Sequence, residues 1–140
     1  MQTKKAGNLI FVRLFTGEDV IAALQKACER HKVKTAVIAS ALGAVKDAEI
    51  GYFVTKGKYK KKKFRRSHEL LALTGSLTKQ EGIYLYHIHA TIADRMHRTF
   101  GGQLFAATAN VTNEIILLCT NLSYERKLEG ETGLKGMYLE

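Results

Sequence analysis

The sequence predicts an α+β fold: one principal helix packed on a mixed, mainly antiparallel sheet, in a single domain spanning residues 1–140. Two observations lead to this prediction. Most of the chain consists of short β-branched or aromatic segments bounded by glycine and polar residues, whereas only residues 17–31 repeat apolar side chains at helical spacing. The chain also contains no proline, no internal repeat and no linker that would divide it.

The first expected strand covers residues 8–15, and a helix follows it directly. The segment NLIFVRLF is rich in the β-branched and aromatic residues that favour strands. Thr16 can cap the helix N-terminus while Asp19, three residues later, reaches back toward it. An apolar stripe then predicts a helix that lies on the sheet and ends near His31, where basic residues suit the negative end of the helix dipole.

The remainder of the chain is predicted to be mainly strands. Residues 35–42 are continuously apolar, which favours a strand covered on both faces. Residues 48–55 and 69–77 are expected to pair as a hairpin. Residues 56–66 would then lie at its projecting end, solvated on a long loop or on extended strand tips. Further strands are expected at residues 83–92, 105–112 and 115–123, and a short one at residues 137–139.

Nearly all of the net charge of +9 comes from one segment. Residues 56–66, KGKYKKKKFRR, hold eight basic residues and no acidic one, so the rest of the chain has a net charge of +1. Tyr59 and Phe64 interleave with the cations, a mixture that can contact phosphates and stack on bases. A solvated loop is the plainer interpretation of a charge run. The candidate nucleic-acid-binding residues are Lys56, Lys58, Lys60, Lys61, Lys62, Lys63, Arg65 and Arg66.

Composition narrows the compartment and the chemistry. The apolar runs are too short to span a bilayer, and the N-terminus lacks the apolar core of a signal peptide, so we expect a cytoplasmic protein with no membrane partner. Cys28 and Cys119 are the only cysteines, which favours two small buried apolar side chains over a disulfide framework or a cysteine zinc cluster. The sequence has no nucleophile elbow and no glycine-rich phosphate loop.

Two histidines lie in the strand pattern of residues 83–92. His87 and His89 fall on the same face, about 6.5 Å apart along the strand, so both rings can reach one metal ion or one polar ligand. Partly buried, hydrogen-bonding histidines are the alternative interpretation. Gly101 and Gly102 permit positive φ and close backbone approach, and we expect a tight entry there into the next strand.

The order of these motifs resembles the plant and prokaryote conserved (PPC) domain. The matching elements are Gly17-Glu18-Asp19-Val20, Ser40, Gly43, residues 69–75, His-Ile-His, Asp94, Gly-Gly-Gln-Leu, Thr112, Glu114 and Thr132-Gly133. The resemblance covers nearly the whole chain and implies a mixed sheet assembled as a homotrimer. Where the family pattern has a third histidine after the paired glycines, this chain has Gln103.

The resemblance also implies a metal site at His87, His89 and Gln103. Zinc is the implied cofactor, held weakly or not at all, because an amide oxygen is a poorer zinc ligand than imidazole. His97 could replace the missing ligand if its loop folds back, although a solvent-facing position is the simpler interpretation. The catalytic residues are unknown, with Glu114 as a candidate general base or partner of the third ligand.

Three functions are therefore open. The first is nonspecific DNA binding, or a transcription-associated role, through the basic segment of residues 56–66, which a homotrimer would present three times. The second is a metal-dependent small-molecule enzyme or binder with a histidine site at the subunit interface. The third is a structural assembly module. The sequence identifies neither a substrate nor a DNA sequence, and enzymatic activity is undecided.

Overall fold

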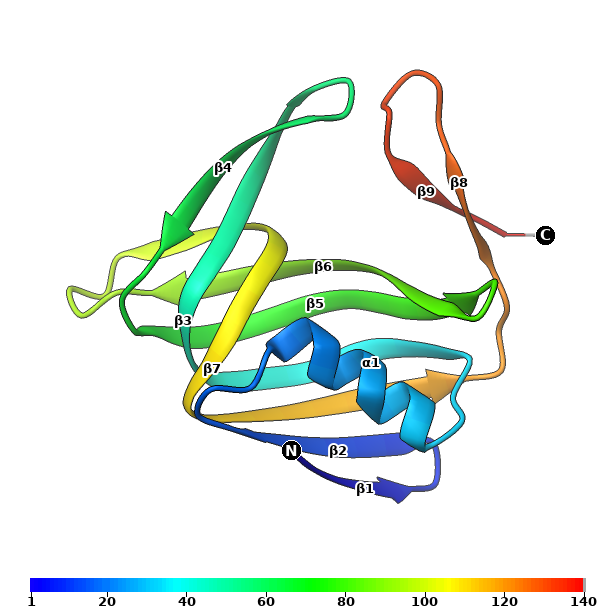
Figure 1. The fold of residues 1–140 in the computed structure, drawn as a ribbon, viewed down its shortest axis with the longest axis horizontal. Coiled ribbons are helices and arrows are strands. Elements are labelled where there is room, and N and C mark those ends of the chain that lie inside the picture. Colours follow the sequence, from blue (N-terminus) through cyan, green and yellow to red (C-terminus); the bar gives the residue numbers. More distant parts are fainter. Residues whose placement is uncertain (140) are drawn as a thin grey trace.

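A computed structural model describes residues 1–139, in which nine strands and one helix occur (Figure 1). The strands are β1 (Gln2–Ala6), β2 (Leu9–Phe15), β3 (Thr35–Thr55), β4 (Lys58–Phe64), β5 (His68–Gln80), β6 (Ile83–Ala93), β7 (Thr99–Thr120), β8 (Glu125–Leu128) and β9 (Lys135–Tyr138), and the helix is α1 (Val20–Arg30). Seven strands form one sheet in the order β1-β2-β7-β6-β5-β3-β4, and β7 also pairs with β3. β8 and β9 form a separate ribbon. The sheet therefore folds back on itself through its two longest strands.

The predicted α+β class is wrong, and so is the mixed sheet. Strands make up 68% of the chain and the helix only 8%. Every strand pairing within residues 1–139 is antiparallel. The fold is a mostly antiparallel sheet with one short helix, and no helix in the described part of the chain is long and apolar enough to cross a membrane.

Two very long strands account for much of the difference. β3 has 21 residues and β7 has 22, and each replaces two shorter strands expected from the sequence. Their mutual pairing shifts register at several points, including between Gly43 and Ala44 and between Lys46 and Glu49. Glycine and polar residues that look like turns in the sequence are therefore β-bulges inside continuous strands.

The helix α1 lies beside β2 and β7 and buries its apolar face in the core. Its N-cap is Asp19, whose Oδ1 accepts a hydrogen bond from the Ala22 N–H at 2.7 Å, so the prediction of Thr16 as the cap is wrong. Burial, with a smaller contribution from Cys119, raises the pKa of the Cys28 thiol to about 12. Cys28 is the buried apolar residue that was predicted, whereas Cys119 is only half-buried.

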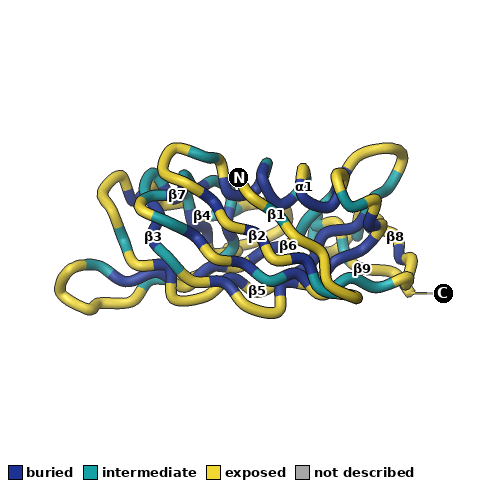
Figure 2. Tube along the Cα trace, turned by 90° about the horizontal axis from the view of Figure 1, so that it is seen from below, coloured by how far each residue is buried: buried dark blue, intermediate teal, exposed yellow. Residues whose placement is uncertain are grey.

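The core lies along the middle of the strands, and the turns and sheet edges are exposed (Figure 2). The largest fully buried side chains are Ile10, Leu14, Leu24, Leu77, Ile88, Ile92, Leu104, Ile115 and Leu117. The outer face of β3 is not covered within the chain: Val37 is 41% exposed and Leu42 is 51% exposed. The expectation that residues 35–42 are covered on both faces therefore fails for a single chain.

The basic segment is largely a strand rather than a loop between strands. β4 pairs with residues 48–55 of β3, whereas β5, the predicted partner of those residues, pairs with an earlier part of β3 and with β6. The tip of the β3–β4 hairpin does not project freely, because the Gly57 N–H donates to the Thr132 C=O at 2.8 Å. The hairpin and the β8–β9 ribbon thus meet at their tips, and we call this pair of elements the hairpin arch (Figure 1).

Candidate functional site

The paired histidines, His87 and His89, share one face of β6 as predicted, and this face points outward. Ile88 between them is fully buried, whereas both imidazoles are exposed. Their Nε2 atoms are 3.2 Å apart, so the two rings converge on the same point. Partial desolvation, the neighbouring His89 and the charge of Arg126 lower the pKa of His87, which favours the neutral ring that metals bind.

Gln103 lies directly opposite His89 in the β6–β7 pairing. Its Oε1 accepts a 2.6 Å hydrogen bond from the hydroxyl of Tyr59 on β4. Tyr59 therefore competes for the amide oxygen that a metal would use. Within residues 1–139 no three His, Cys, Asp or Glu side chains form a group that could hold a metal ion. The donor set fits a weak two-imidazole site and not a three-histidine one.

Gly101 and Gly102 lie inside β7, not at its entry. Gly102 has φ +151°, and a Cβ there would lie 2.6 Å from the carbonyl oxygen of Gly51 on β3. Glycine is therefore needed where β3, β6 and β7 come together, immediately before Gln103. The predicted close approach is right, but the tight turn lies earlier, in residues 94–98.

That turn is organised by Asp94. Its Oδ1 accepts hydrogen bonds from the backbone N–H groups of Met96 and Arg98, and its Oδ2 accepts two from the Arg98 guanidinium at 2.7 and 2.9 Å. The Arg98 hydrogen bonds lower the pKa of the Asp94 carboxyl. His97 is exposed in the same turn with φ +61° and does not form a metal-binding group with the paired histidines.

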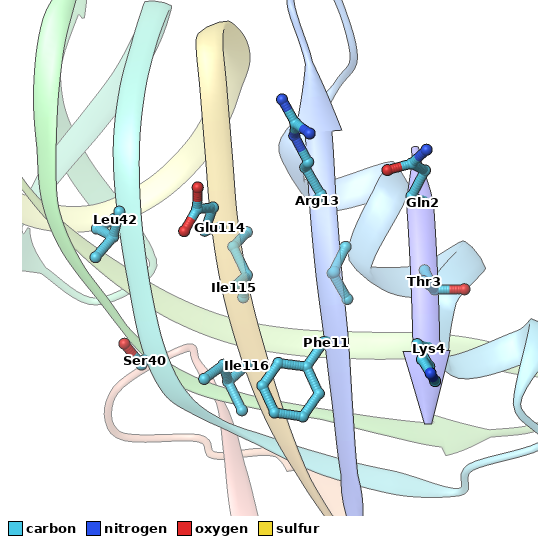
Figure 3. Close-up of a pocket in the computed structure, with 11 residues that line it drawn as sticks. Gln2, Thr3, Lys4, Phe11, Arg13, Ser40, Leu42, Glu114, Ile115 and Ile116 are labelled. Atoms are coloured by element: carbon cyan, nitrogen blue, oxygen red, sulfur yellow. The ribbon is translucent and has the colours of Figure 1, made fainter. Parts of the chain in front are cut away.

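Glu114 lies at a different site from the paired histidines. It is on the outer face of β7, between Leu42 of β3 and Arg13 of β2 in the sheet register, beside a cavity of about 450 Å³ (Figure 3). Apolar side chains dominate this surface, and we call it the open sheet face: Phe11, Val37, Leu42, Ile116 and Leu118. Within one chain Glu114 is not brought to the paired histidines as a general base.

The lysines of β4 divide between two faces of the strand. Lys61 lies 2.9 Å from Glu49 and 3.9 Å from the centre of the Phe105 ring, and Lys63 lies 3.9 Å from Asp47. On the other face, Lys58 and Lys60 are exposed and enter no ion pair within the described residues. Two of the five β4 lysines therefore have acidic partners on β3. The fifth lysine, Lys62, also enters no ion pair within the described residues, and its ammonium lies 5.0 Å from the centres of the Phe64 and Phe100 rings.

The aromatic residues of the basic segment are not free to stack on bases. Tyr59 donates to Gln103 and packs against Phe105, and Phe64 is buried against Phe100. The most exposed aromatic side chain of the hairpin is Tyr52, which is 76% exposed and lies opposite Lys60 in the β3–β4 pairing. The register of the β3–β4 hairpin shows that Tyr52 lies beside the exposed lysines. Assigning the hairpin turn to Lys56-Gly57 would have identified Tyr52 from the sequence alone.

A second cavity, of about 190 Å³, lies under the hairpin arch. Its lining includes Tyr59, Tyr86, His87, Gln103, Arg126 and Lys135. Arg126 and Lys135 belong to the β8–β9 ribbon, and no sequence motif or spacing singles out either residue.

Comparisons with known proteins agree on the fold. A structure from Bacteroides thetaiotaomicron, described as a candidate DNA-binding protein, has 23% identity and a TM-score of 0.90 over 99% of this chain and 96% of that one. A plant- and prokaryote-conserved protein from Pyrococcus horikoshii has 26% identity and a TM-score of 0.84 over 94% and 92% of the two chains. A metal-containing protein from Archaeoglobus fulgidus has 28% identity and a TM-score of 0.83 over 96% and 95%.

Sequence comparisons identify the family. The bifunctional protein GlmU of a Synechococcus strain is 28% identical over 131 residues, which are 92% of this chain and 20% of that protein. The chain thus spans about a fifth of the length of the curated relatives it matches. The model of the Plants and Prokaryotes Conserved (PCC) domain matches residues 1–120. The resemblance inferred from the motifs is confirmed, and the chain belongs to the Plants and Prokaryotes Conserved domain family.

Proposed function

We propose that this protein binds nucleic acid without sequence specificity, through the face of the β3–β4 hairpin that carries Lys58 and Lys60. The observation that carries the proposal is the division of the β4 lysines: Lys61 and Lys63 have acidic partners, whereas Lys58 and Lys60 have none among residues 1–139. Exposed, unpaired cations contact phosphates without reading bases. The Bacteroides relative described as a candidate DNA-binding protein supports the same class of ligand.

Tyr52 adds a contact that lysines cannot make. The ring is 76% exposed beside Lys60, so it is available to stack on an unpaired base while the ammonium groups neutralise the backbone. Stacking of this kind contributes about 1–3 kcal/mol per base and tolerates any sequence. We therefore propose that single-stranded nucleic acid is bound at least as well as duplex. Cytoplasmic location is part of this proposal, since nucleic acid is accessible there.

The direct test is binding of a labelled duplex and a labelled single strand, measured by fluorescence anisotropy at increasing salt concentration. The affinity for both should fall steeply with salt, because each phosphate contact releases counterions. Replacing Tyr52 by leucine should weaken single-strand binding more than duplex binding. A parent chain that binds neither ligand at low salt would contradict the proposal.

We also propose that the chain assembles as a homotrimer through the open sheet face. The proposal is supported by the family resemblance and by the exposure of Phe11 (46%), Leu42 (51%) and Leu118 (39%) on one surface. Assembly would present three hairpins together and raise weak affinities through effective concentration. Light scattering should give three times the 15.6 kDa mass of one chain, and Leu42→Lys should lower it. A parent chain that is monomeric at micromolar concentrations would contradict this assembly.

Zinc binding at the paired histidines is a second candidate function. It is favoured by the 3.2 Å separation of the His87 and His89 Nε2 atoms and by the description of the Archaeoglobus relative as metal-containing. His87 and His89 would hold the ion, and Gln103 is the remaining donor beside them, with Tyr59 competing for its oxygen. A zinc ion with so few protein ligands supplies a Lewis acid with open coordination positions.

A further inference from the structure

Arg126 is a buried cation with no acidic partner among residues 1–139. It is 6% exposed, and no ion pair within residues 1–139 includes it. Its guanidinium donates only to uncharged groups: the Ser76 hydroxyl at 3.1 Å, the Tyr124 hydroxyl at 3.4 Å and the Lys135 carbonyl at 3.3 Å. The Nε atom is buried and has no hydrogen-bond partner. Burying a charge in this way is unfavourable unless an opposite charge joins it.

The cavity under the hairpin arch is the place where such an opposite charge fits. Arg126 and Lys135 both line it, and none of its described lining residues is Asp or Glu. The other polar lining groups include Gln103, whose amide NH₂ can donate hydrogen bonds while its Oε1 accepts from the Tyr59 hydroxyl. A volume of about 190 Å³ admits a small molecule, not a polynucleotide strand.

The fold does not depend on the guanidinium to hold the ribbon in place. The Arg126 backbone N–H donates to Gln80 Oε1 at 2.9 Å, and the Tyr124 and Ser76 hydroxyls share a 2.7 Å hydrogen bond. At the far end of the ribbon, Thr132 accepts from Gly57. These contacts attach the ribbon to the sheet at both ends without the Arg126 side chain. The centre of the Tyr124 ring lies 5.4 Å from the guanidinium carbon and offsets part of the charge. A purely structural role still leaves the buried Nε unexplained.

We propose that the cavity under the hairpin arch binds a small anion that carries a carboxylate or phosphate group, with Arg126 as the main cationic donor and Lys135 as the second. The planar guanidinium matches the paired oxygens of either group, and the burial of Arg126 strengthens the contact. The Tyr59 and Tyr86 side chains surround the body of the ligand. This site is distinct from the nucleic-acid surface of β4 and requires no metal at the paired histidines.

The proposal can be tested with inorganic phosphate and benzoate, added to the metal-stripped full chain at constant ionic strength. The readouts are the ¹⁵N-detected Nε–H resonance of Arg126, identified by its loss in Arg126→Met, and the midpoint of thermal unfolding. At least one probe should move the resonance saturably and raise the unfolding midpoint of the parent. Arg126→Met should weaken the affinity for that probe about tenfold or more.

Lys60→Met is the matched control, since it removes the same charge from the exposed face of β4. It should leave the response to the probe unchanged. If Lys60→Met and Arg126→Met lose the same affinity for the probe, binding depends only on the overall positive charge of the protein, and the proposal is overturned. So would an Arg126 resonance that neither probe moves.

The thermal data separate a ligand-binding role from a structural one. If Arg126 binds an anion, Arg126→Met should unfold at the same or a higher temperature than the parent without the probe, because an uncompensated buried charge is removed. If Arg126→Met unfolds at a lower temperature in every solution and still gains stability from the probe, the proposal fails. Should Arg126→Met not fold, Lys135→Met, altered at an exposed residue, must reduce the rise of the unfolding midpoint that the probe causes; an unchanged rise overturns the proposal.

Discussion

The lysines of β4 and the single Arg126 carry the same charge in opposite settings. Lys58 and Lys60 are exposed and hydrated, so each contributes little alone and their effect depends on number and on salt. Arg126 is 6% exposed, so its effect depends on which atoms lie against its guanidinium. The exposed lysines of β4 therefore indicate a polyanionic partner without a fixed contact geometry. The buried Arg126 indicates a small ligand with a defined geometry.

The β4 hairpin and the cavity of Arg126 both adjoin the backbone contact between Gly102 and Gly51. Disrupting this contact should have the largest effect on stability. Gly102 lies against β3, which carries the β4 hairpin, and directly precedes Gln103, which lines the cavity of Arg126. Gly102→Ala introduces a Cβ 2.6 Å from the Gly51 carbonyl oxygen at φ +151°, so we expect a loss of about 2–4 kcal/mol in the free energy of unfolding. Urea denaturation measures it.

The control for this substitution is Gly130→Ala. Gly130 has no positive φ, and a Cβ there meets nothing within 4 Å. Its substitution should change the free energy of unfolding by less than about 0.5 kcal/mol. Equal stability of the two variants would show that the contact between β3 and β7 at Gly102 is not a close one.

The zinc affinity of the paired histidines tests how Gln103 is held. Gln103→His should tighten zinc binding about tenfold or more, because imidazole replaces an amide oxygen that Tyr59 already occupies. Competition with a chromophoric chelator measures this for the parent, Gln103→His and His89→Ala. A parent that binds zinc as tightly as Gln103→His must use another ligand, and no binding by either protein would make the paired histidines structural.

A smaller effect tests whether the charge of Arg126 reaches the paired histidines. Desolvation, His89 and Arg126 hold the pKa of His87 below its usual value of 6.5, so the ring should gain its proton only at a more acidic pH than a free histidine. Arg126→Met removes a positive charge and should raise the pKa of His87, whereas Lys60→Met should leave it unchanged. NMR titration of the imidazole resonances measures both, and a His87 pKa that is the same in Arg126→Met and the parent would contradict this account.

The parts of the fold that local periodicity determines were predictable from the sequence. The alternation in residues 83–92 and the apolar stripe of the helix match β6 and α1. The continuity of β3 and β7 was not predictable, because positions such as Gly43 resemble turns in one dimension and become bulges only when a long partner pairs across them. The predicted fold class failed because these bulges concealed how much of the chain is strand.

The candidate site was likewise predictable only in part from the sequence. The spacing of His87 and His89 and the position of Gln103 follow from the strand period and the motif order. The separation of paired from unpaired lysines requires the register that sets Glu49 and Asp47 beside Lys61 and Lys63. Arg126 has no local sequence signal, since its importance arises from its burial and from the lack of an acidic neighbour in the described part of the chain, which are properties of tertiary packing.

The most direct test of nucleic-acid binding compares two double variants that remove equal charge from the two faces of β4. Lys58→Gln/Lys60→Gln removes two lysines that have no acidic partner among residues 1–139, and Lys61→Gln/Lys63→Gln removes the lysines paired with Glu49 and Asp47. The measurement is the slope of log affinity against log salt for one duplex. The first variant should flatten the slope by about 1.8, the amount for two lost phosphate contacts, and the second by much less. Equal flattening by both variants would contradict the account, and an unchanged slope in the first would place the nucleic-acid surface elsewhere.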